Sequence, residues 1–357
     1  CRAGRNVMAV RLGLIGCGAV GQKHVQALAH LDGAELTATV DQDRDRAEAA
    51  ALPFDATAFT SVDSLYKSGL VDAVVIATPS GTHPEIAFQA MEQGLDVLVE
   101  KPLALSYREA VDLTRFADDA GVLLAVTHFN RMLPGPAVVL DAVRSGRLGR
   151  LLSGGVDVRW ARPQAYYDEA PWRGTRAMDG GVLFNQAIHA LDLLVQVFGR
   201  ADEVFGYADT QTHRIEAEDV VTGAVHFESG AVATVNVTTS VPEKNLEECI
   251  TVVGESGVAV LGPQNSALQV LRTGHEGDDG RVMDELKRAE PWPSWRSHWN
   301  ALADFVQAVE SRRPPALHAI TTLDVLALVE ALTRSGLSGR PVRIDELQRE
   351  RGLGSLA

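Results

Sequence analysis

The sequence predicts a two-domain protein: an α/β domain with a doubly wound parallel sheet, followed by an α+β domain with a large open, mostly antiparallel sheet. With 357 residues, 46% of them hydrophobic and 22% charged, the chain is too long for one ordinary core and too apolar to be disordered. From about Val10 to Val126, short runs rich in Val, Ile and Leu alternate with longer amphipathic stretches. After about Arg131, strands joined by turn residues follow one another. We therefore expect domains over residues 8–130 and 131–357.

The strands of the first domain are continuous apolar runs, as expected for strands that are buried on both faces. They are Val10 to Ile15, Leu36 to Val40, Ala73 to Ala77, Val97 to Val99 and Val122 to Val126. Helical periodicity marks the stretches between them: Ala19 to Leu31, Arg44 to Leu52, His83 to Gln93 and Tyr107 to Ala120. Ser106 is the predicted N-cap of the last helix, with Glu109 three residues later. Residues 1–7, which precede Met8, are left out of the expected domains.

In the second domain, two pairs of apolar strands flank short turns that contain glycine, and each pair predicts an antiparallel hairpin. The pairs are Val220 to Phe227 with Ala231 to Ser240, and Cys249 to Val253 with Val258 to Leu261. Thr234, Asn236 and Thr238 share one face of their strand, so we expect a polar face that meets solvent or a second subunit. Two helices, one beginning near Trp299 and one over Thr321 to Ser335, are expected near the end of the chain, where they can pack back on the first domain.

The formal charge of −14 argues against two classes of partner. Nucleic acid and anionic membranes both need a basic face, so we expect neither. No apolar run approaches the roughly 18 to 20 residues that span a bilayer, and the first residues lack the apolar core of a signal peptide, so we expect a cytoplasmic protein. Cys1, Cys17 and Cys249 are too few and too scattered for a disulfide framework or a zinc site, and we expect no metal.

A glycine-rich turn joins the first predicted strand to the first helix. It contains Gly16, Gly18 and Gly21, with Ala19 and Val20 between the last two glycines. The backbone N–H groups of such a turn, together with the helix N-terminus, can bind a pyrophosphate, so the turn predicts a Rossmann-type dinucleotide site. A glycine pattern taken alone can also mark an ordinary turn.

Asp41 supports the dinucleotide site because it ends the second predicted strand, 20 residues after Gly21. A carboxylate in this place holds the hydroxyls of the adenosine ribose. The alternative is a turn carboxylate at a strand end. Its charge would repel the 2′-phosphate of NADP, so the sequence favours NAD as the cofactor. Arg44, three residues later, would weaken that repulsion.

Lys101 follows the apolar strand that ends at Val99, and therefore lies at the carboxyl edge where parallel α/β sheets bind ligands. A lysine held there beside nicotinamide can share or relay the proton of a hydroxyl that is losing hydride. The plainer alternative is a solvated surface lysine beside Pro102, which breaks the strand.

Asn185, His189 and Asp192 project along one side of a predicted helix, because four and three residues separate them. Histidine titrates near neutral pH, so His189 can accept an alcohol proton during oxidation and return it during reduction. An amide cannot titrate, which limits Asn185 to orienting a substrate hydroxyl or His189. The alternative for His189 is a buried helix histidine satisfied by its neighbours. For Asp192 we favour a structural role.

A stretch rich in arginine and aromatic residues predicts the substrate site. Arg162, Tyr167, Trp172 and Arg173 belong to it. Such side chains suit sugar hydroxyls, ring faces, or an attached carboxylate or phosphate. A loop packed by its own aromatic residues is the alternative.

Four motifs, in this order, resemble those of the Gfo/Idh/MocA family, the glucose-fructose oxidoreductase and inositol dehydrogenase group. They are Gly16 to Gly21, Ala77 to His83, Glu100-Lys101-Pro102, and Gly180 to Asp192. The resemblance spans essentially the whole chain, and Glu-Lys-Pro is its most specific part. The chain departs from the most familiar pattern at Asn185, where many members carry an aspartate, and in having two glycines rather than three before the helix.

The resemblance implies an NAD(P)-dependent oxidoreductase that acts on a hydroxyl of a sugar, sugar acid, nucleotide sugar or cyclitol, with Lys101 and His189 as the catalytic pair. Further cofactor contacts implied by it are Thr78, Pro79, His83, Glu100 and Asn130, and Arg131 is implied to approach nicotinamide or substrate. For His83, a helix start before Pro84 is the alternative. The resemblance also suggests a homodimer or homotetramer formed through the open sheet face.

Two alternative functions stay open. One is a glycosidase that uses tightly bound NAD for transient oxidation of its substrate. The other is a non-catalytic NAD-binding sensor or co-regulator, since a fold alone does not prove activity. A sensor need not keep Lys101 and His189, and the presence of both favours the oxidoreductase.

Overall fold

The computed structural model describes residues 9–262, 267–274, 276–288, 293 and 295–349, so residues 1–7 lie outside the described range. The chain divides into two compact units. The first contains the described residues up to 104, residues 109–129 and the described part of 292–321. The second contains residues 105–108 and the described parts of 130–291 and 322–357.

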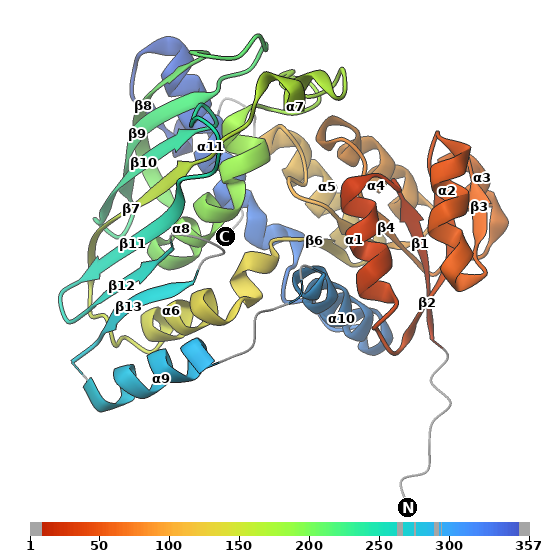
Figure 1. Ribbon diagram of the computed structural model, residues 1–357, viewed down its shortest axis with the longest axis horizontal. Helices are drawn as coiled ribbons and strands as arrows, with labels where there is room; N and C mark the ends of the chain where they lie inside the picture. Colours follow the sequence, from red (N-terminus) through yellow and green to blue (C-terminus); the bar gives the residue numbers. More distant parts are fainter. Residues whose placement is uncertain (1–8, 263–266, 275, 289–292, 294, 350–357) are drawn as a thin grey trace, which may run out of the picture. The chain divides into compact units, whose positions relative to one another are not determined.

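The first unit is built on a six-stranded sheet (Figure 1). In spatial order its strands are β3 (Thr57–Phe59), β2 (Ala34–Val40), β1 (Val10–Ile15), β4 (Ala73–Ile76), β5 (Asp96–Val99) and β6 (Leu124–Val126). All adjacent pairs are parallel. This is the Rossmann strand order, and it confirms the predicted doubly wound sheet. The sequence did not predict β3, whose three residues are too few to show a pattern.

Helices connect these strands, and one helix comes from much later in the chain. They are α1 (Ala19–Leu28), α2 (Arg44–Ala51), α3 (Val62–Ser68), α4 (His83–Glu92), α5 (Tyr107–Ala120) and α10 (Arg296–Ser311). Leu302, Phe305 and Val306 of α10 are buried in the same core cluster as Leu12 of β1 and Val25 of α1. The core of the first unit is therefore completed by α10.

The second unit is built on an eight-stranded sheet. Its order is β13 (Leu268–Arg272), β12 (Val258–Leu261), β11 (Glu247–Gly254), β7 (Leu151–Arg159), β10 (Val232–Thr238), β9 (Val220–Phe227), β8 (Ala201–Asp209) and β14 (Val342–Arg343). Both predicted hairpins are confirmed, β9 with β10 and β11 with β12. The pairing of β7 with β10 is parallel and the other pairs are antiparallel. The predicted mostly antiparallel sheet is confirmed.

Helices pack on one face of this sheet, where α8 contacts β7 and α11 contacts β8 (Figure 1). The helices of the unit are α6 (Pro134–Arg144), α7 (Gln164–Asp168), the π-helix η4 (Leu183–Ala187), α8 (Ile188–Phe198), α9 (Glu276–Arg288), α11 (Leu323–Ser338) and α12 (Ile344–Arg349). Thr234, Asn236 and Thr238 alternate with the buried Val235 and Val237, so the predicted polar face exists.

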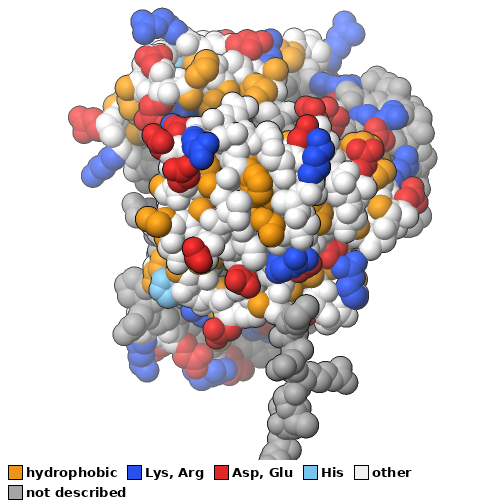
Figure 2. Space-filling view, turned by 90° about the vertical axis from the view of Figure 1, so that its right-hand side faces the viewer, with side chains coloured by type: hydrophobic (Ala, Val, Ile, Leu, Met, Phe, Trp, Pro, Cys, Tyr) orange, Lys and Arg blue, Asp and Glu red, His pale blue; other side chains and the backbone are white. Residues whose placement is uncertain are grey.

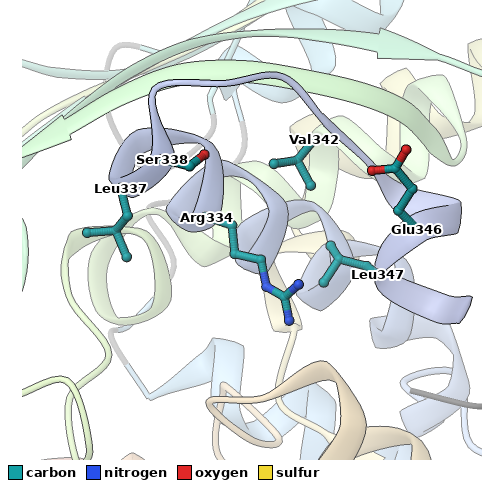
Figure 3. A pocket seen from close by; sticks show the side chains of 6 residues that line it. All are labelled: Arg334, Leu337, Ser338, Val342, Glu346 and Leu347. Atoms are coloured by element: carbon teal, nitrogen blue, oxygen red, sulfur yellow. The ribbon is translucent and has the colours of Figure 1, made fainter. Parts of the chain in front are cut away.

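A surface pocket lies where the end of α11 meets β14 and α12 (Figure 3). Its lining residues are Arg334, Leu337, Ser338, Val342, Glu346 and Leu347. None of them is a predicted site residue, so the candidate functional site is elsewhere.

The charged side chains, the hydropathy of the helices and the cysteines of the described residues can be compared with the sequence predictions. On the face shown in Figure 2, acidic and basic side chains are interspersed. No helix in the described ranges has both the length and the apolar character that crossing a bilayer requires. Of the cysteines, Cys17 and Cys249 are free thiols, and Cys1 lies outside the described residues.

Candidate functional site

The glycine turn between β1 and α1 is shaped by close backbone contacts. Gly16 has φ +95°, and a Cβ on it would lie 2.5 Å from the carbonyl oxygen of Ala77. A Cβ on Gly21 would overlap the carbonyl oxygen of Gly16, whereas a Cβ on Gly18 would meet nothing within 4 Å. Gly18 is also the N-cap of α1 and supplies no side-chain cap. Two of the glycines thus let backbones approach, and the third leaves open space at a helix N-terminus, where a pyrophosphate fits.

Asp41 follows β2 and is joined to the glycine turn. Its Oδ2 accepts a hydrogen bond of 2.8 Å from the backbone N–H of Cys17, and its Oδ1 accepts one of 2.9 Å from Asp43. Ala19 and Val20, in the first turn of α1, are exposed next to this turn. Arg44 forms an ion pair of 2.7 Å with Glu48. The carboxylate of Asp41 and the glycine turn therefore form one structural element, and the charge of Arg44 is engaged by another acid.

The loop after β4 carries Thr78, Pro79 and His83. The hydroxyl of Thr82 lies 2.7 Å from both the Thr78 hydroxyl and the Pro79 carbonyl oxygen. The ring of His83 is buried between two backbone carbonyl oxygens, that of Pro102 at 2.7 Å and that of Thr78 at 2.8 Å. Burial lowers the pKa of His83. His83 begins α4, and its ring also ties the loop after β4 to the loop after β5.

The predicted Glu-Lys-Pro motif begins directly after β5. The side chain of Glu100 is buried, 2.8 Å from Nε2 of His24. Lys101 is half-buried, and its backbone N–H donates to the hydroxyl of Thr127 over 3.2 Å. The motif therefore pairs an inward-facing carboxylate with a partly exposed lysine at the carboxyl edge of the sheet.

In the second unit, Asn185 lies in η4, and His189 and Asp192 lie in α8. Asn185 and His189 are the two partly exposed residues between 181 and 190, where the other eight are buried. The Asn185 amide donates to the carboxylate of Asp179. Between residues 181 and 190, these two side chains are thus the polar groups that reach the surface of the unit.

Arg131 and Asp192 form a buried ion pair, with Nε 2.7 Å from Oδ2. Burial raises the pKa of Asp192, and the charge of Arg131 opposes that rise. Arg131 follows Asn130 in the 3-10 helix η3 (Phe129–Met132), where Asn130 is buried. The pair fixes η3 to α8, in agreement with the structural role that we favour for Asp192.

Close neighbours explain the two glycines before η4: Leu105 and Phe184 for Gly180, and Glu218, in the loop between β8 and β9, for Gly181. Gly180 and Gly181 have φ values of +80° and +87°, and a Cβ on Gly181 would overlap the Glu218 carboxylate. Burial raises the pKa of Glu218 to about 7, and hydrogen bonds from its own backbone and that of Leu183 partly oppose this. A carboxyl group therefore lies against the start of the helix that carries Asn185 and His189.

Arginine and aromatic side chains stack in the predicted substrate stretch. The guanidinium of Arg162 lies 4.9 Å from the ring centroid of Trp160 and 5.4 Å from that of Tyr166. The guanidinium of Arg173 lies 4.0 Å from the Tyr166 ring and 5.1 Å from that of Trp172. Tyr166 thus contacts both arginines. We call these five residues the arginine–aromatic stack.

Arg162 is held by neutral groups. Within the described part of the chain its hydrogen-bond partners are the Ala161 carbonyl at 2.8 Å, Gln186 at 3.0 Å and Asn245 at 3.2 Å. Its own carbonyl lies 2.6 Å from Nε2 of His213. Arg173, by contrast, lies 3.3 Å from Glu169. The positive charge of Arg162 therefore has no acidic partner among the described residues, and it can bind an anion.

Tyr167, predicted to bind substrate, is directed inward. Its hydroxyl is buried and lies 2.9 Å from that of Thr239. Burial raises its pKa to about 12. It also lines a shallow pocket with Arg173, Arg214 and Gln164. Its neighbour Tyr166, which the sequence did not single out, occupies the stack instead.

Some site residues escaped sequence reasoning because they come from distant parts of the chain. Asp179 and Glu218 contact the segment that carries Asn185, and Asp219 holds His213 at 2.7 Å. No local pattern of residues distinguishes these acids from ordinary turn carboxylates. The sequence offers one hint, the pair Gly180-Gly181, because glycines with positive φ often stand where another group approaches closely.

The turn built from Gly16, Gly18 and Gly21, with a carboxylate after β2, is the arrangement of a dinucleotide-binding Rossmann domain. Residues 10–128 match the model of an oxidoreductase family with an NAD-binding Rossmann fold, and residues 138–260 match the GFO/IDH/MocA C-terminal domain. The chain belongs to the Gfo/Idh/MocA family and is an NAD-binding oxidoreductase. The predicted family, fold class and cofactor are confirmed.

Several relatives resemble the chain over nearly its full length. The WlbA dehydrogenase of Bordetella pertussis, solved with NADH and UDP-GlcNAcA, is 34% identical with a TM-score of 0.84, covering 94% of this chain and 98% of that one. WlbA of Chromobacterium violaceum, with the same two ligands, is 31% identical with a TM-score of 0.86, covering 94% and 96%. D-xylose 1-dehydrogenase (NADP(+)) 2 of Haloferax volcanii is 27% identical over 93% of this chain and 99% of its own.

Alanine substitutions at Gly18 and Gly21 form a matched pair. We expect Gly18→Ala to fold normally and to bind NADH at least about tenfold more weakly, because its methyl group would enter the space for the pyrophosphate. We expect Gly21→Ala to lose thermal stability as well, because its methyl group collides with backbone. Fluorescence titration with NADH and thermal melting measure both effects. Unchanged NADH affinity in Gly18→Ala contradicts the assignment.

Glu218→Gln tests the buried carboxyl group. A folded-state pKa near 7 means that the folded protein holds a proton that the unfolded chain releases above about pH 4.5. Its contribution to stability is therefore present below that pH and lost as pH rises through 7, by on the order of 3 kcal/mol. We expect Glu218→Gln to flatten this part of the stability profile in urea unfolding at pH 5 to 8. The exposed Glu216→Gln is the control, and equal profiles in both variants refute the assignment.

Proposed function

We propose that the protein oxidises a hydroxyl of a nucleotide-activated sugar acid with NAD, with Lys101 and His189 handling the proton. The carrying observation is that Lys101 stands at the carboxyl edge of the sheet whose glycine turn has open space for a pyrophosphate. Bound NAD supplies the acceptor for the hydride that leaves the carbinol carbon. Lys101 and His189 take up the proton of the same hydroxyl, leaving a ketone, and the reverse transfers serve reduction.

The roles within this pair follow from chemistry. Lys101 is partly buried, which leaves its side-chain amine able to contact the reacting oxygen and to share its proton with His189, while its backbone is tied to Thr127. His189 is a base of suitable strength, and Asn185 beside it donates or accepts hydrogen bonds without titrating. Asn185 is therefore proposed to orient the substrate hydroxyl. Asn130 and Arg131 are proposed to approach nicotinamide or substrate.

The arginine–aromatic stack supports the substrate class. A guanidinium whose partners are neutral can pair with a carboxylate or a phosphate, and the adjoining rings can stack on a sugar or a base. The two WlbA dehydrogenases were solved with UDP-GlcNAcA, whose name describes a nucleotide sugar. We propose Arg162, Arg173 and Trp172 as substrate contacts, with Tyr166 in the place first expected for Tyr167.

Asp41 supports NAD over NADP. Its carboxylate is anchored by Cys17, and Arg44 is paired with Glu48, so the repulsion of a 2′-phosphate is not offset by that arginine. The contacts of Thr78, Pro79, His83 and Glu100 with the cofactor are proposed from their places in the loops after β4 and β5. The assembly into a homodimer or homotetramer stays a prediction, as does the cytoplasmic location.

Lys101→Met tests the catalytic assignment. We expect turnover of NAD with an active member of a panel of nucleotide sugars, free sugars and cyclitols to fall by about 10²- to 10⁴-fold, because the proton-handling group is lost. We expect NADH affinity to stay near that of the wild type, since the glycine turn is untouched. NADH absorbance and fluorescence titration give the two values. Full turnover in Lys101→Met would sink the assignment.

Arg162→Met tests the substrate class. Methionine keeps much of the length of the side chain and removes its charge, so we expect KM for a nucleotide-activated sugar acid to rise at least about tenfold. NADH affinity should not change. The control is Arg150→Met, which removes an exposed arginine paired with Glu255 at 2.7 Å. A KM equal to that of the control variant rules out Arg162 as the anion contact.

A further inference from the structure

A buried carboxylate lies at the centre of three histidine and hydroxyl contacts in the first unit. Glu100 is 6% exposed, His24 0% and His298 4%. Oε1 of Glu100 lies 2.8 Å from Nε2 of His24 and 3.6 Å from Nε2 of His298. The two imidazole rings meet edge to face, with centroids 4.9 Å apart. Helices α1 and α10 therefore each direct one histidine at the same carboxylate.

The carboxylate of Glu100 is ionised. Burial alone would raise its pKa, but the hydrogen bond and charge of His24, together with His298, hold the pKa of Glu100 well below its usual range. Burial lowers the pKa of His298 to about 4, so this ring is neutral at neutral pH. Of the two histidine contacts to Glu100, the one from His24 is the shorter, at 2.8 Å. An ionised group in such a place is stable only while its hydrogen-bond donors remain.

The network continues to the backbone of Lys101. The hydroxyl of Thr127 accepts the N–H of Lys101 at 3.2 Å, and its dipole helps to lower the pKa of Glu100. Thr127 is fully buried, and its own N–H donates to Val99 at 2.9 Å. Lys101 also follows Glu100 directly in the chain. The backbone of Lys101 is therefore held on one side by the anchored Glu100 and on the other by Thr127.

His24 also belongs to the cofactor helix. It lies three residues after Gly21 in α1, whose N-terminus holds the open space beside Gly18. The path from His24 through Glu100 and Thr127 to Lys101 therefore joins the glycine turn to the loop that carries the lysine. Every member of this path lies within the first unit.

We propose that His24 is a positioning residue. Through Glu100 and Thr127, it holds Lys101 in a fixed position relative to the glycine turn. This inference rests on the proposed function, in which Lys101 handles the substrate proton. Small displacements of a proton-handling group reduce turnover strongly, so the network controls kcat more than substrate or cofactor affinity.

His24, Glu100 and His298 also form a three-donor cluster, with ligand atoms within 4.8 Å of one another. A metal-bound imidazole usually donates its other N–H to an acceptor. Among the described residues, Nδ1 of His24 and Nδ1 of His298 have no hydrogen-bond partner. The cluster fits a hydrogen-bonded network better than a metal site, and elemental analysis of the purified protein decides between them.

Three variants in and just after α1 test the proposal. We expect His24→Leu to lower kcat by about 10- to 100-fold, with KM and NADH affinity close to those of the wild type. We expect His24→Gln to recover most of kcat, because its amide can donate to Glu100 as the imidazole does. The control is His30→Leu, which removes an exposed histidine six residues later. Acylation of Lys101 relative to Lys67, read by peptide mass spectrometry, should rise in His24→Leu but not in His24→Gln or His30→Leu, and it gives a readout independent of turnover.

Thr127→Val covers the case in which His24→Leu fails to fold around an unpaired carboxylate. It removes the hydroxyl and leaves the contact between His24 and Glu100, and we expect the same fall in kcat and the same rise in Lys101 acylation. Wild-type values of both in Thr127→Val, or in a folded His24→Leu, overturn the positioning role. Equimolar zinc in the purified protein overturns it as well. The proposed function fails separately, when Lys101→Met keeps its turnover.

Discussion

An ionised carboxylate buried at the end of a parallel strand must be stabilised by polar groups that pack around it, and Glu100 imposes this requirement on the first unit. Its partners come from α1, from the residue after β6 and from α10, which are far apart in the sequence. His298 of α10 adds a contact to this carboxylate, and the apolar side chains of α10 place the helix in the core of the unit. The requirement explains why a packing histidine, His24, lies on the same helix as the glycine turn.

The second unit follows a comparable rule, in which a carboxyl group and two glycines define the start of a helix. Glu218 occupies the volume that a Cβ of Gly181 would need, and the first turns beyond it carry the partly exposed Asn185 and His189. Beside it in the sequence, arginines alternate with aromatic rings, and Arg162 keeps its charge without an acidic partner among the described residues. The residues proposed for proton transfer and those proposed for anion binding thus belong to two different local structures, the helix start beside Glu218 and the arginine–aromatic stack.

Patterns with a local cause were predictable from the sequence. The first and last residues of β1 and α5 agree with the prediction, because a continuous apolar run and an amphipathic repeat each mark where the element begins and ends. The glycine turn and Lys101 were predicted as site residues because each directly follows a predicted strand of the parallel sheet. Short elements such as β3 and α3 show no periodicity, and no sequence pattern marked the π-helical turn at Asn185. Contacts such as Glu218 with Gly181, or Arg162 with Gln186, join segments whose proximity only the folded chain reveals.

The most direct test of the account follows the hydride itself. The protein would be incubated with NAD and a nucleotide-activated sugar acid that carries deuterium at its ring carbons, and the mass of the nicotinamide product would be measured. Transfer of one deuterium to nicotinamide, with a ketone left on the sugar ring, is the result that we predict. Undeuterated nicotinamide and an unchanged sugar, from a protein that still binds NADH, would contradict the account and favour a binding function.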